Sequence, residues 1–189
     1  MITTVPIIPA EPNLEDVRKV IPFYQEWFPS LISWLLDRYE SSPEYPYLDT
    51  KYDVIKKRNF AQSDQFRGPD AVYGWIQGRG LESLVTHARW MSLPELDFSG
   101  KQNLLDRLHE AINRLYRCLS DLREKNDGHV YFLMGSNGVP AFADGLRPAS
   151  EIYTFADIFC AKGMYAAAHF LKSAAGIRKA KEYLVSIEA

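Results

Sequence analysis

A stripe of apolar residues between positions 104 and 122 constrains the fold of this chain more than any other feature. Its members recur at steps of three and four residues, which places them on one face of an α-helix. They are Leu104, Leu105, Leu108, Ile112, Leu115, Tyr116, Leu119 and Leu122. We predict a helix that opens at Asp97 or Ser99 and ends near Asn126-Asp127-Gly128. The chain is therefore expected to be built from long helices.

Two further helices are predicted before this one. Apolar residues at helical spacing cover 14–39, although Pro22 and Pro29 should kink that helix or break it into pieces. A second helix is expected over 70–91, capped by the aspartate at its first position. The segment between them, 41–69, is polar and holds several turn signals, so we expect a largely solvated loop. Long loops in compact domains often carry function.

The C-terminal part of the chain predicts a short β-hairpin and two more helices. Strand-like residues on both sides of Ser136-Asn137-Gly138 favour a hairpin over 129–142. A fourth helix is expected over 150–174, and its small residues indicate close packing against neighbours on several sides. Gly176 should separate it from a fifth helix over 177–187. The expected fold class is all-α with a short β-hairpin.

The composition limits the partners of this protein. The chain has 189 residues, 47% of them hydrophobic, which is enough for one substantial core, so 1–189 is expected to be a single domain. The formal net charge is -2 and the charges are interspersed, which leaves no basic stripe for a nucleic acid. No run approaches the ~18 apolar residues of a membrane span, and no signal peptide is recognised. A cytoplasmic protein without membrane partners is expected.

The cysteines and histidines show no pattern of a metal or cofactor site. Cys118 and Cys160 match no metal-ligand spacing and are expected to be reduced thiols in the core. His87, His109 and His169 lack the spacing to other ligands that a metal or a catalytic base would need. We therefore expect no metal and no cofactor.

Trp75 and Arg79 are the candidate functional residues of the second helix. They lie four residues apart, about one helical turn, so both side chains should project from the same face. An arginine in a buried helix needs a hydrogen-bonded partner or a ligand. The structural alternative is an ion pair of Arg79 with Asp70, Glu82 or Asp157, with Trp75 in the core.

Four motifs follow one another along the chain: Trp75-Ile76-Gln77-Gly78-Arg79, Gly128-His129-Val130-Tyr131-Phe132, Asn137-Gly138-Val139-Pro140 and Phe155-Ala156-Asp157-Ile158-Phe159. In this order they resemble the N-terminal part of the N-acylglucosamine 2-epimerase superfamily, which includes cellobiose 2-epimerases and mannose isomerase-like enzymes. The resemblance extends from about Phe23 to the C-terminus. It implies an (α/α)6 toroid of twelve helices, of which this chain would supply about five as an incomplete single domain.

The resemblance also implies a reaction and roles for four residues. Epimerisation or isomerisation of an open-chain hexose or N-acylhexosamine removes a proton beside the carbonyl and forms an enediolate. Arg79 would be the catalytic residue that orients the substrate, because its planar fork can donate two parallel hydrogen bonds to sugar oxygens. Trp75 would be an apolar platform for the sugar, and Phe155 and Asp157 would contribute to substrate binding. The acid and base histidines of the family come from later helices and have no counterpart in this chain.

Two other functions remain open at this stage. The chain could be a non-catalytic sugar-binding or interaction protein that keeps the arginine but lacks the bases. A glycoside hydrolase of the six-hairpin class would need two carboxylates, and Asp157 is the only central candidate. An incomplete ring also predicts a homodimer or a complementing chain, and an exposed apolar patch on the inner helices or on 177–187.

Overall fold

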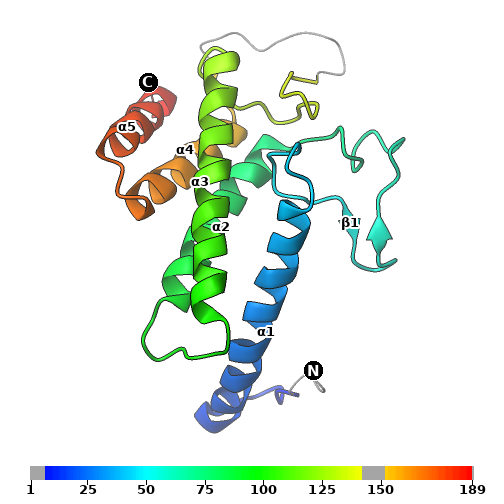
Figure 1. Cartoon of the computed structure of the whole chain (residues 1–189), viewed down its shortest axis with the longest axis vertical. Coiled ribbons are helices and arrows are strands. Elements are labelled where there is room, and N and C mark those ends of the chain that lie inside the picture. The colour runs from blue at the N-terminus through cyan, green and yellow to red at the C-terminus, as the bar shows by residue number, and fades with distance from the viewer. Residues whose placement is uncertain (1–6, 142–151, 189) are drawn as a thin grey trace.

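The fold is mostly helical, as expected. The computed structural model describes residues 7–141 and 152–188 of the chain. In these ranges it contains α1 (Leu14–Glu40), β1 (Tyr52–Asp53), β2 (Arg58–Asn59), α2 (Gly74–Met91), α3 (Lys101–Lys125), α4 (Phe155–Phe170) and α5 (Ala174–Glu188). β1 and β2 pair in an antiparallel two-stranded sheet that projects from the helices (Figure 1). The all-α prediction is confirmed at this level.

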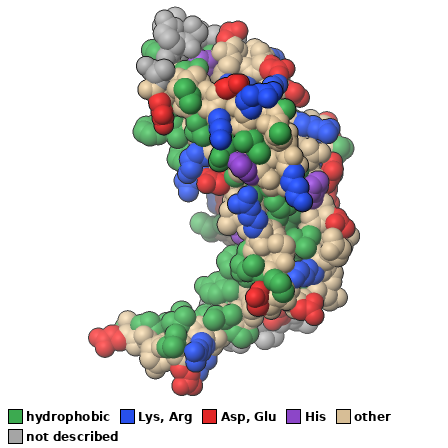
Figure 2. Space-filling view, turned by 90° about the vertical axis from the view of Figure 1, so that its left-hand side faces the viewer, with side chains coloured by type: hydrophobic (Ala, Val, Ile, Leu, Met, Phe, Trp, Pro, Cys, Tyr) green, Lys and Arg blue, Asp and Glu red, His purple; other side chains and the backbone are tan. Residues whose placement is uncertain are grey.

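The helices are arranged in two layers. α3 crosses in front of α2 and α4, and α1 lies beside α3 (Figure 1). α2 and α4 form the most extensive helix contact, and α5 packs on α4. Figure 2 shows that the molecule is curved and that its hollow side is the rear of Figure 1, the side of α2 and α4.

The apolar stripe of α3 forms the centre of the core. Leu108, Ile112, Leu115 and Leu119 are fully buried, as the spacing predicted. The predicted end of this helix is also confirmed, because α3 ends at Lys125, directly before Asn126. Leu105 and Tyr116 of the predicted stripe are only half-buried, and the helix begins at Lys101 after Gly100 rather than at Asp97 or Ser99.

α2 and α4 approach each other through glycines. A Cβ atom added to Gly163 would overlap the backbone carbonyl of Gly78, and one added to Gly78 would overlap the backbone of Phe159 and Cys160. Ala161 and Ala167 are fully buried near this crossing. The prediction of close packing by small residues is confirmed.

Exposed apolar side chains occur on several elements. The N-terminal half of α1 extends beyond the other helices (Figure 2, bottom) and exposes Leu14, Val17, Ile21 and Tyr24. Phe132, Phe155 and Val185 are also exposed, on the segment after α3 and on α4 and α5. Exposure on α4 and α5 was expected for an open ring, whereas the apolar stripe on α1 was not.

α1 begins at Leu14, as predicted, but each of the first two helices differs from the prediction in one respect. α1 is one continuous helix that contains Pro22 and Pro29, with Asn13 as its cap. Pro22 is exposed, so water can bind the carbonyl group that the proline leaves without a donor. α2 begins at Gly74 and not at Asp70, because the residues before Gly74 pair with another segment: Val72 and Met134 exchange backbone hydrogen bonds of 2.8 Å.

The predicted hairpin is reduced to single bridges. Met134 pairs with Val72 and with Pro140, around a turn in which the Gly138 N–H donates to the Gly135 carbonyl at 2.9 Å. Residue 142, at the end of the prediction, lies outside the described residues. The regular strands lie instead in 41–69, where a loop was expected.

The helices at the C-terminal end also have different bounds. Residues 150 and 151 of the predicted fourth helix lie outside the described residues. α4 begins at Phe155 because Thr154 is its cap, and it ends at Phe170. The break before α5 lies at Lys172, which has a positive φ of 54°. Gly176 is therefore inside α5 and does not separate the two helices.

Candidate functional site

Five residues from three parts of the chain form a surface that we call the aromatic-arginine face: Tyr73, Trp75, Arg79, Phe132 and Phe159. The ring centroid of Trp75 lies 6.3 Å from that of Phe132 and 6.4 Å from that of Phe159. The ring centroids of Tyr73 and Phe132 are 5.7 Å apart. The guanidinium carbon of Arg79 lies 5.3 Å from the centre of the Phe159 ring. Trp75 and Arg79 therefore share one face, as their spacing predicted.

Arg79 is exposed, so the prediction of a buried arginine is wrong. The buried side of α2 is formed instead by Gln77, Gly78 and Leu81, which face α4 and the segment after α1. Gln77 exchanges hydrogen bonds with the backbone of Leu48, at 2.7 Å to the N–H and 3.3 Å to the carbonyl. Because Gly78 must face α4 to allow the close crossing, Arg79 is turned toward solvent.

The ion-pair alternative for Arg79 is also not observed. Asp70 accepts a hydrogen bond of 2.8 Å from Ser136, and Glu82 pairs with Lys162 at 3.6 Å. Within the described residues, Arg79 forms no hydrogen bond or ion pair, and its contact is with the Phe159 ring. Its guanidinium is therefore available to a ligand.

The aromatic side chains around Arg79 offer flat apolar surface. Trp75 is half-buried, and its indole N–H is buried without a hydrogen-bond partner among the described residues. Phe132 is 54% exposed. Phe155 is 75% exposed and lies one helical turn before Phe159, which places both rings on one side of α4. These rings extend the face along α4.

Asp157 lies beneath this surface and not on it. Its carboxylate is 1% exposed and accepts hydrogen bonds from Val130 N–H (2.9 Å), Tyr183 O–H (2.6 Å), and Thr154 N–H (2.8 Å) and O–H (3.1 Å). His129 Nδ1 lies 3.5 Å from the same carboxylate. Burial raises the pKa of Tyr183 far above its usual value, and the charge of Asp157 adds to this effect. The carboxylate thus joins the start of α4 to α5, and its role toward a ligand stays a prediction.

The histidines lie elsewhere. Each has an aromatic ring neighbour, with centroid separations of 6.0, 5.8, 4.7 and 4.5 Å in the pairs His87–Phe28, His109–Phe170, His129–Tyr153 and His169–Tyr165. None of these rings belongs to the aromatic-arginine face. In 7–141 and 152–188 no three or more His, Cys, Asp or Glu side chains are grouped so that they could hold a metal ion.

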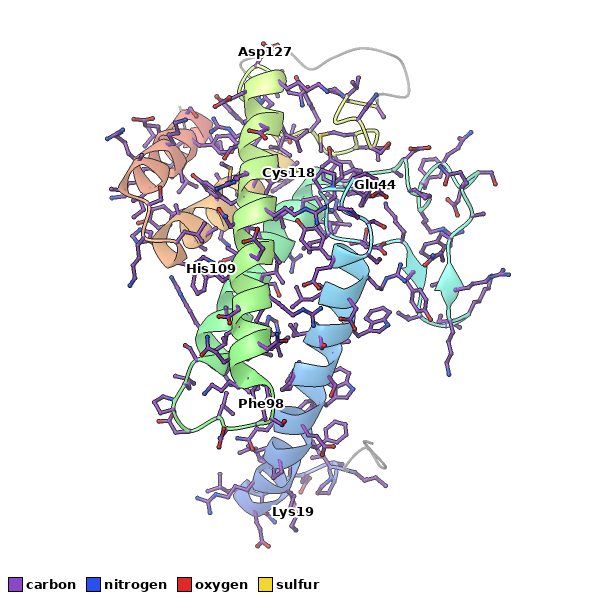
Figure 3. All side chains as sticks on the ribbon, viewed as in Figure 1. Lys19, Glu44, Phe98, His109, Cys118 and Asp127 are labelled. Atoms are coloured by element: carbon purple, nitrogen blue, oxygen red, sulfur yellow. The ribbon has the colours of Figure 1, made fainter. Side chains whose placement is uncertain are left out.

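Both cysteines are free thiols, as predicted, and Cys160 is fully buried. Burial raises the pKa of Cys118, on α3 (Figure 3), from 9.0 to about 12, and Asp121 contributes to the same shift. Because the thiolate is the reactive form, we expect iodoacetamide at pH 8 to alkylate native Cys118 about a thousandfold more slowly than the unfolded chain. Mass spectrometry with and without urea measures both rates, and equal rates would contradict the shift.

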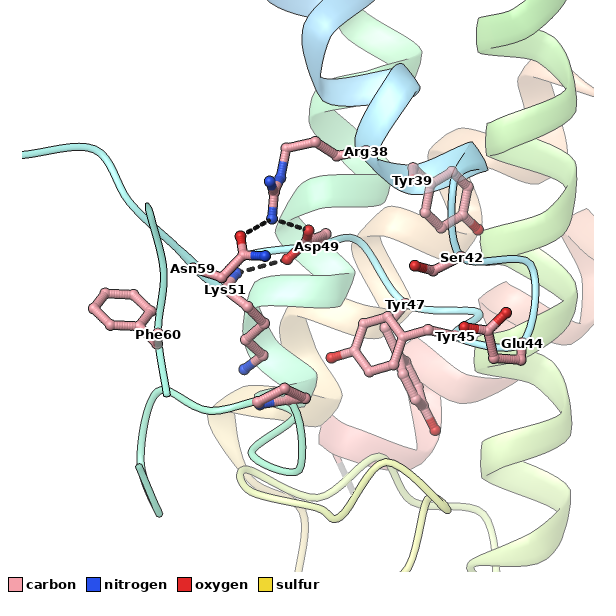
Figure 4. Close-up of a pocket in the computed structure, with 11 residues that line it drawn as sticks. Arg38, Tyr39, Ser42, Glu44, Tyr45, Tyr47, Asp49, Lys51, Asn59 and Phe60 are labelled. Carbon is pink, nitrogen blue, oxygen red and sulfur yellow. Dashed lines mark hydrogen bonds and ion pairs between the residues drawn. The ribbon is translucent and has the colours of Figure 1, made fainter. Parts of the chain in front are cut away.

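A second candidate site lies between the end of α1 and the segment that follows it. We call it the Lys51 pocket, and its cavity has a volume of about 230 Å³. In Figure 4, charged and amide side chains line one side, and tyrosine rings line the other together with Ser42 and Glu44. The main lining residues are Arg38, Asp49, Lys51 and Asn59, and opposite them Tyr39, Tyr45 and Tyr47.

No sequence pattern predicts this pocket, because Lys51 lies between acidic residues in a stretch that was expected to be solvated. That expectation is wrong at Lys51, which is only 7% exposed. Its ammonium donates a hydrogen bond to the Ala71 carbonyl and lies 5.8 Å from the centre of the Tyr73 ring. Tyr73 therefore lies between the Lys51 ammonium and the rest of the aromatic-arginine face.

Comparison with known proteins does not assign this chain to a family. No family model, no curated protein and no solved structure matches it. Over the part of the chain that the structure describes, no helix is both long enough and apolar enough to cross a membrane. The two sites are therefore judged by their own geometry.

Proposed function

We propose that this protein binds a sugar on its aromatic-arginine face and that it forms the N-terminal part of an epimerase-like (α/α) toroid. The observation that carries this proposal is the Arg79 guanidinium, which is exposed beside aromatic rings and has no carboxylate partner among the described residues. Sugar rings are commonly held between an apolar platform and charged hydrogen-bonding groups. Arg79 and Trp75 supply one of each.

The chemistry of Arg79 suits an open-chain sugar. Its planar guanidinium group donates parallel hydrogen bonds to adjacent oxygens and stays charged at all working pH values. In an epimerase or isomerase the same group would stabilise the enediolate oxygen that develops when the proton beside the carbonyl is removed. Phe155 and Phe159 would extend the platform formed by Trp75, and Asp157 would hold α4 in place below it.

The arrangement of the helices supports the toroid part of the proposal. α2 and α4 pack directly on each other, α3 contacts both of them, and α5 packs on α4. In a complete ring, the side of α2 and α4 that is hollow in Figure 2 would face the centre. Further helices, from a second copy or from another chain, would then close the ring and contribute the missing acid and base.

The positions of the histidines favour binding alone as the second candidate function. The ring neighbours of His87, His109, His129 and His169 all lie outside the aromatic-arginine face. A proton beside a sugar carbonyl needs a base within hydrogen-bond reach. Exchange of the C2 proton of the sugar in D2O, followed by NMR, distinguishes the two functions: incorporation of deuterium indicates the enzyme, and binding without exchange indicates the binder.

Replacing Arg79 by alanine is the direct test of sugar binding. We expect Arg79→Ala to weaken the binding of N-acetylglucosamine or glucose by about tenfold to a hundredfold, because it removes charge-assisted hydrogen bonds. The melting temperature should stay within a few degrees of wild type, since the side chain is exposed. Isothermal titration calorimetry and thermal unfolding measure the two effects.

Arg89→Ala is the matched control, because Arg89 is also exposed and lies on the last turn of α2. It should bind sugar as the wild type does. If neither sugar binds to the wild type, or if both variants lose affinity equally, the aromatic-arginine face is not a sugar site.

A further inference from the structure

The Lys51 pocket has walls that are held in place by hydrogen bonds. Arg114 of α3 donates to the carbonyl oxygens of Ser42 (3.2 Å), Pro43 (2.8 Å) and Tyr45 (3.0 Å). These bonds fix the segment after α1 against the core. The tyrosine side of the cavity is thus built into the fold without any ligand.

Lys51 is a buried cation of this pocket. It is 7% exposed, its ammonium donates to the Ala71 carbonyl, and no carboxylate of the described residues forms an ion pair with it. A buried ammonium without a counter-charge is costly. Burial accordingly lowers the pKa of Lys51, although the more distant charges of Asp49 and Asp64 act in the opposite direction.

The carboxylate nearest in the pocket is already engaged. Asp49 pairs with Arg38 and also accepts a hydrogen bond of 2.8 Å from the backbone N–H of Lys51. Arg38 Nε and the Tyr45 hydroxyl are buried and have no hydrogen-bond partner among the described residues. Two buried donors of the pocket therefore lack an acceptor, although the exposed Glu44 carboxylate also lines the cavity. A carboxylate bound on the Lys51 side would accept from the Tyr45 hydroxyl and pair with the Lys51 ammonium.

The size and the walls of the cavity define the rest of the ligand. A volume of about 230 Å³ is larger than a bare inorganic anion requires, and aromatic rings form much of the lining. Phe60, on the side opposite the tyrosines in Figure 4, and Pro69 add apolar surface to the lining. A compact apolar body would pack against these side chains while its charged end faces Lys51.

We propose that the Lys51 pocket binds a small organic carboxylate with an aromatic or alicyclic body, and that Lys51 is its counter-ion. The carboxylate accepts hydrogen bonds from the Lys51 ammonium and the Tyr45 hydroxyl. The ring of the ligand lies against the tyrosine side of the cavity. This site is separate from the aromatic-arginine face and does not depend on sugar binding there.

Titration of the full chain with benzoate tests the proposal. We expect saturable binding by calorimetry, with amide chemical-shift changes in NMR spectra at Lys51, Tyr45 and Asn59. Benzyl alcohol, which has the ring without the charge, should bind at least about tenfold more weakly. Inorganic phosphate, which has the charge without the ring, should also bind more weakly. Equal or tighter binding of phosphate would overturn the assignment to an organic carboxylate.

Two variants separate a ligand contact from a structural role. Lys51→Met keeps the length of the side chain and should lower benzoate affinity at least about tenfold, whereas Lys56→Met, at an exposed lysine, should leave it unchanged. Tyr45→Phe removes a hydroxyl that has no hydrogen-bond partner among the described residues, so it should fold normally and bind benzoate about fivefold more weakly. Unchanged affinity in both Lys51→Met and Tyr45→Phe, or no benzoate binding by the wild type, would overturn the proposal.

Discussion

Gly163→Ala is expected to destabilise this protein by about 3 kcal/mol or more, because the new methyl group would overlap the Gly78 carbonyl at the crossing of α2 and α4. Alanine favours a helix over glycine by about 1 kcal/mol. The measured loss of stability is therefore smaller than the free energy of the steric overlap by about this amount. The neighbour is backbone and cannot rotate away as a side chain can. The two helices must therefore separate, which disturbs the largest contact in the fold. Urea unfolding followed by circular dichroism measures the loss.

Gly80→Ala is the matched control on α2. A Cβ atom at Gly80 would meet the end of the Leu48 side chain, which can change its rotamer. We expect the free energy of unfolding to change by no more than about 1 kcal/mol. If Gly163→Ala and Gly80→Ala have similar stabilities, α2 and α4 do not approach as closely as described here.

The sequence predicted helices well where a single face is buried along the whole element. The stripe of α3 is one example, since its period alone defines both the helix and the side chains that enter the core. The start of α2 was predicted poorly because it depends on the pairing of Val72 with Met134, more than 60 residues later. Such long-range pairing leaves no local signal. The β1–β2 pair and the Met134–Pro140 bridge are local, but they are too short to give the alternating pattern by which a strand is recognised.

The sequence predicted that Trp75 and Arg79 share a face of α2, but it did not predict that Arg79 is exposed. Trp75 and Arg79 do share a face, because that follows from the helical repeat. Whether the face points inward depends on Gly78, which only tertiary packing against α4 reveals. The Lys51 pocket could not be predicted, because its burial results from Arg114 and α1 holding the following segment in place.

Asp157→Ala is expected to destabilise the fold by about 3 kcal/mol or more. The carboxylate is 1% exposed and accepts hydrogen bonds from Val130, Thr154 and Tyr183. Its removal leaves these donors buried and unpaired, and each unpaired donor costs about 1 kcal/mol or more. Asp121→Ala, at an exposed aspartate on α3, is the control and should change the stability by less than about 0.5 kcal/mol.

The Tyr183 hydroxyl gives this prediction a second, independent measurement. In the wild type, Tyr183→Phe removes one hydrogen bond of 2.6 Å and should cost about 1 kcal/mol. In the Asp157→Ala background the same change removes a buried hydroxyl that has lost its acceptor, so it should recover stability. The sign of the Tyr183→Phe effect therefore reverses between the two backgrounds. If Tyr183→Phe costs the same in both, the two side chains are not coupled, and the carboxylate does not join α4 to α5.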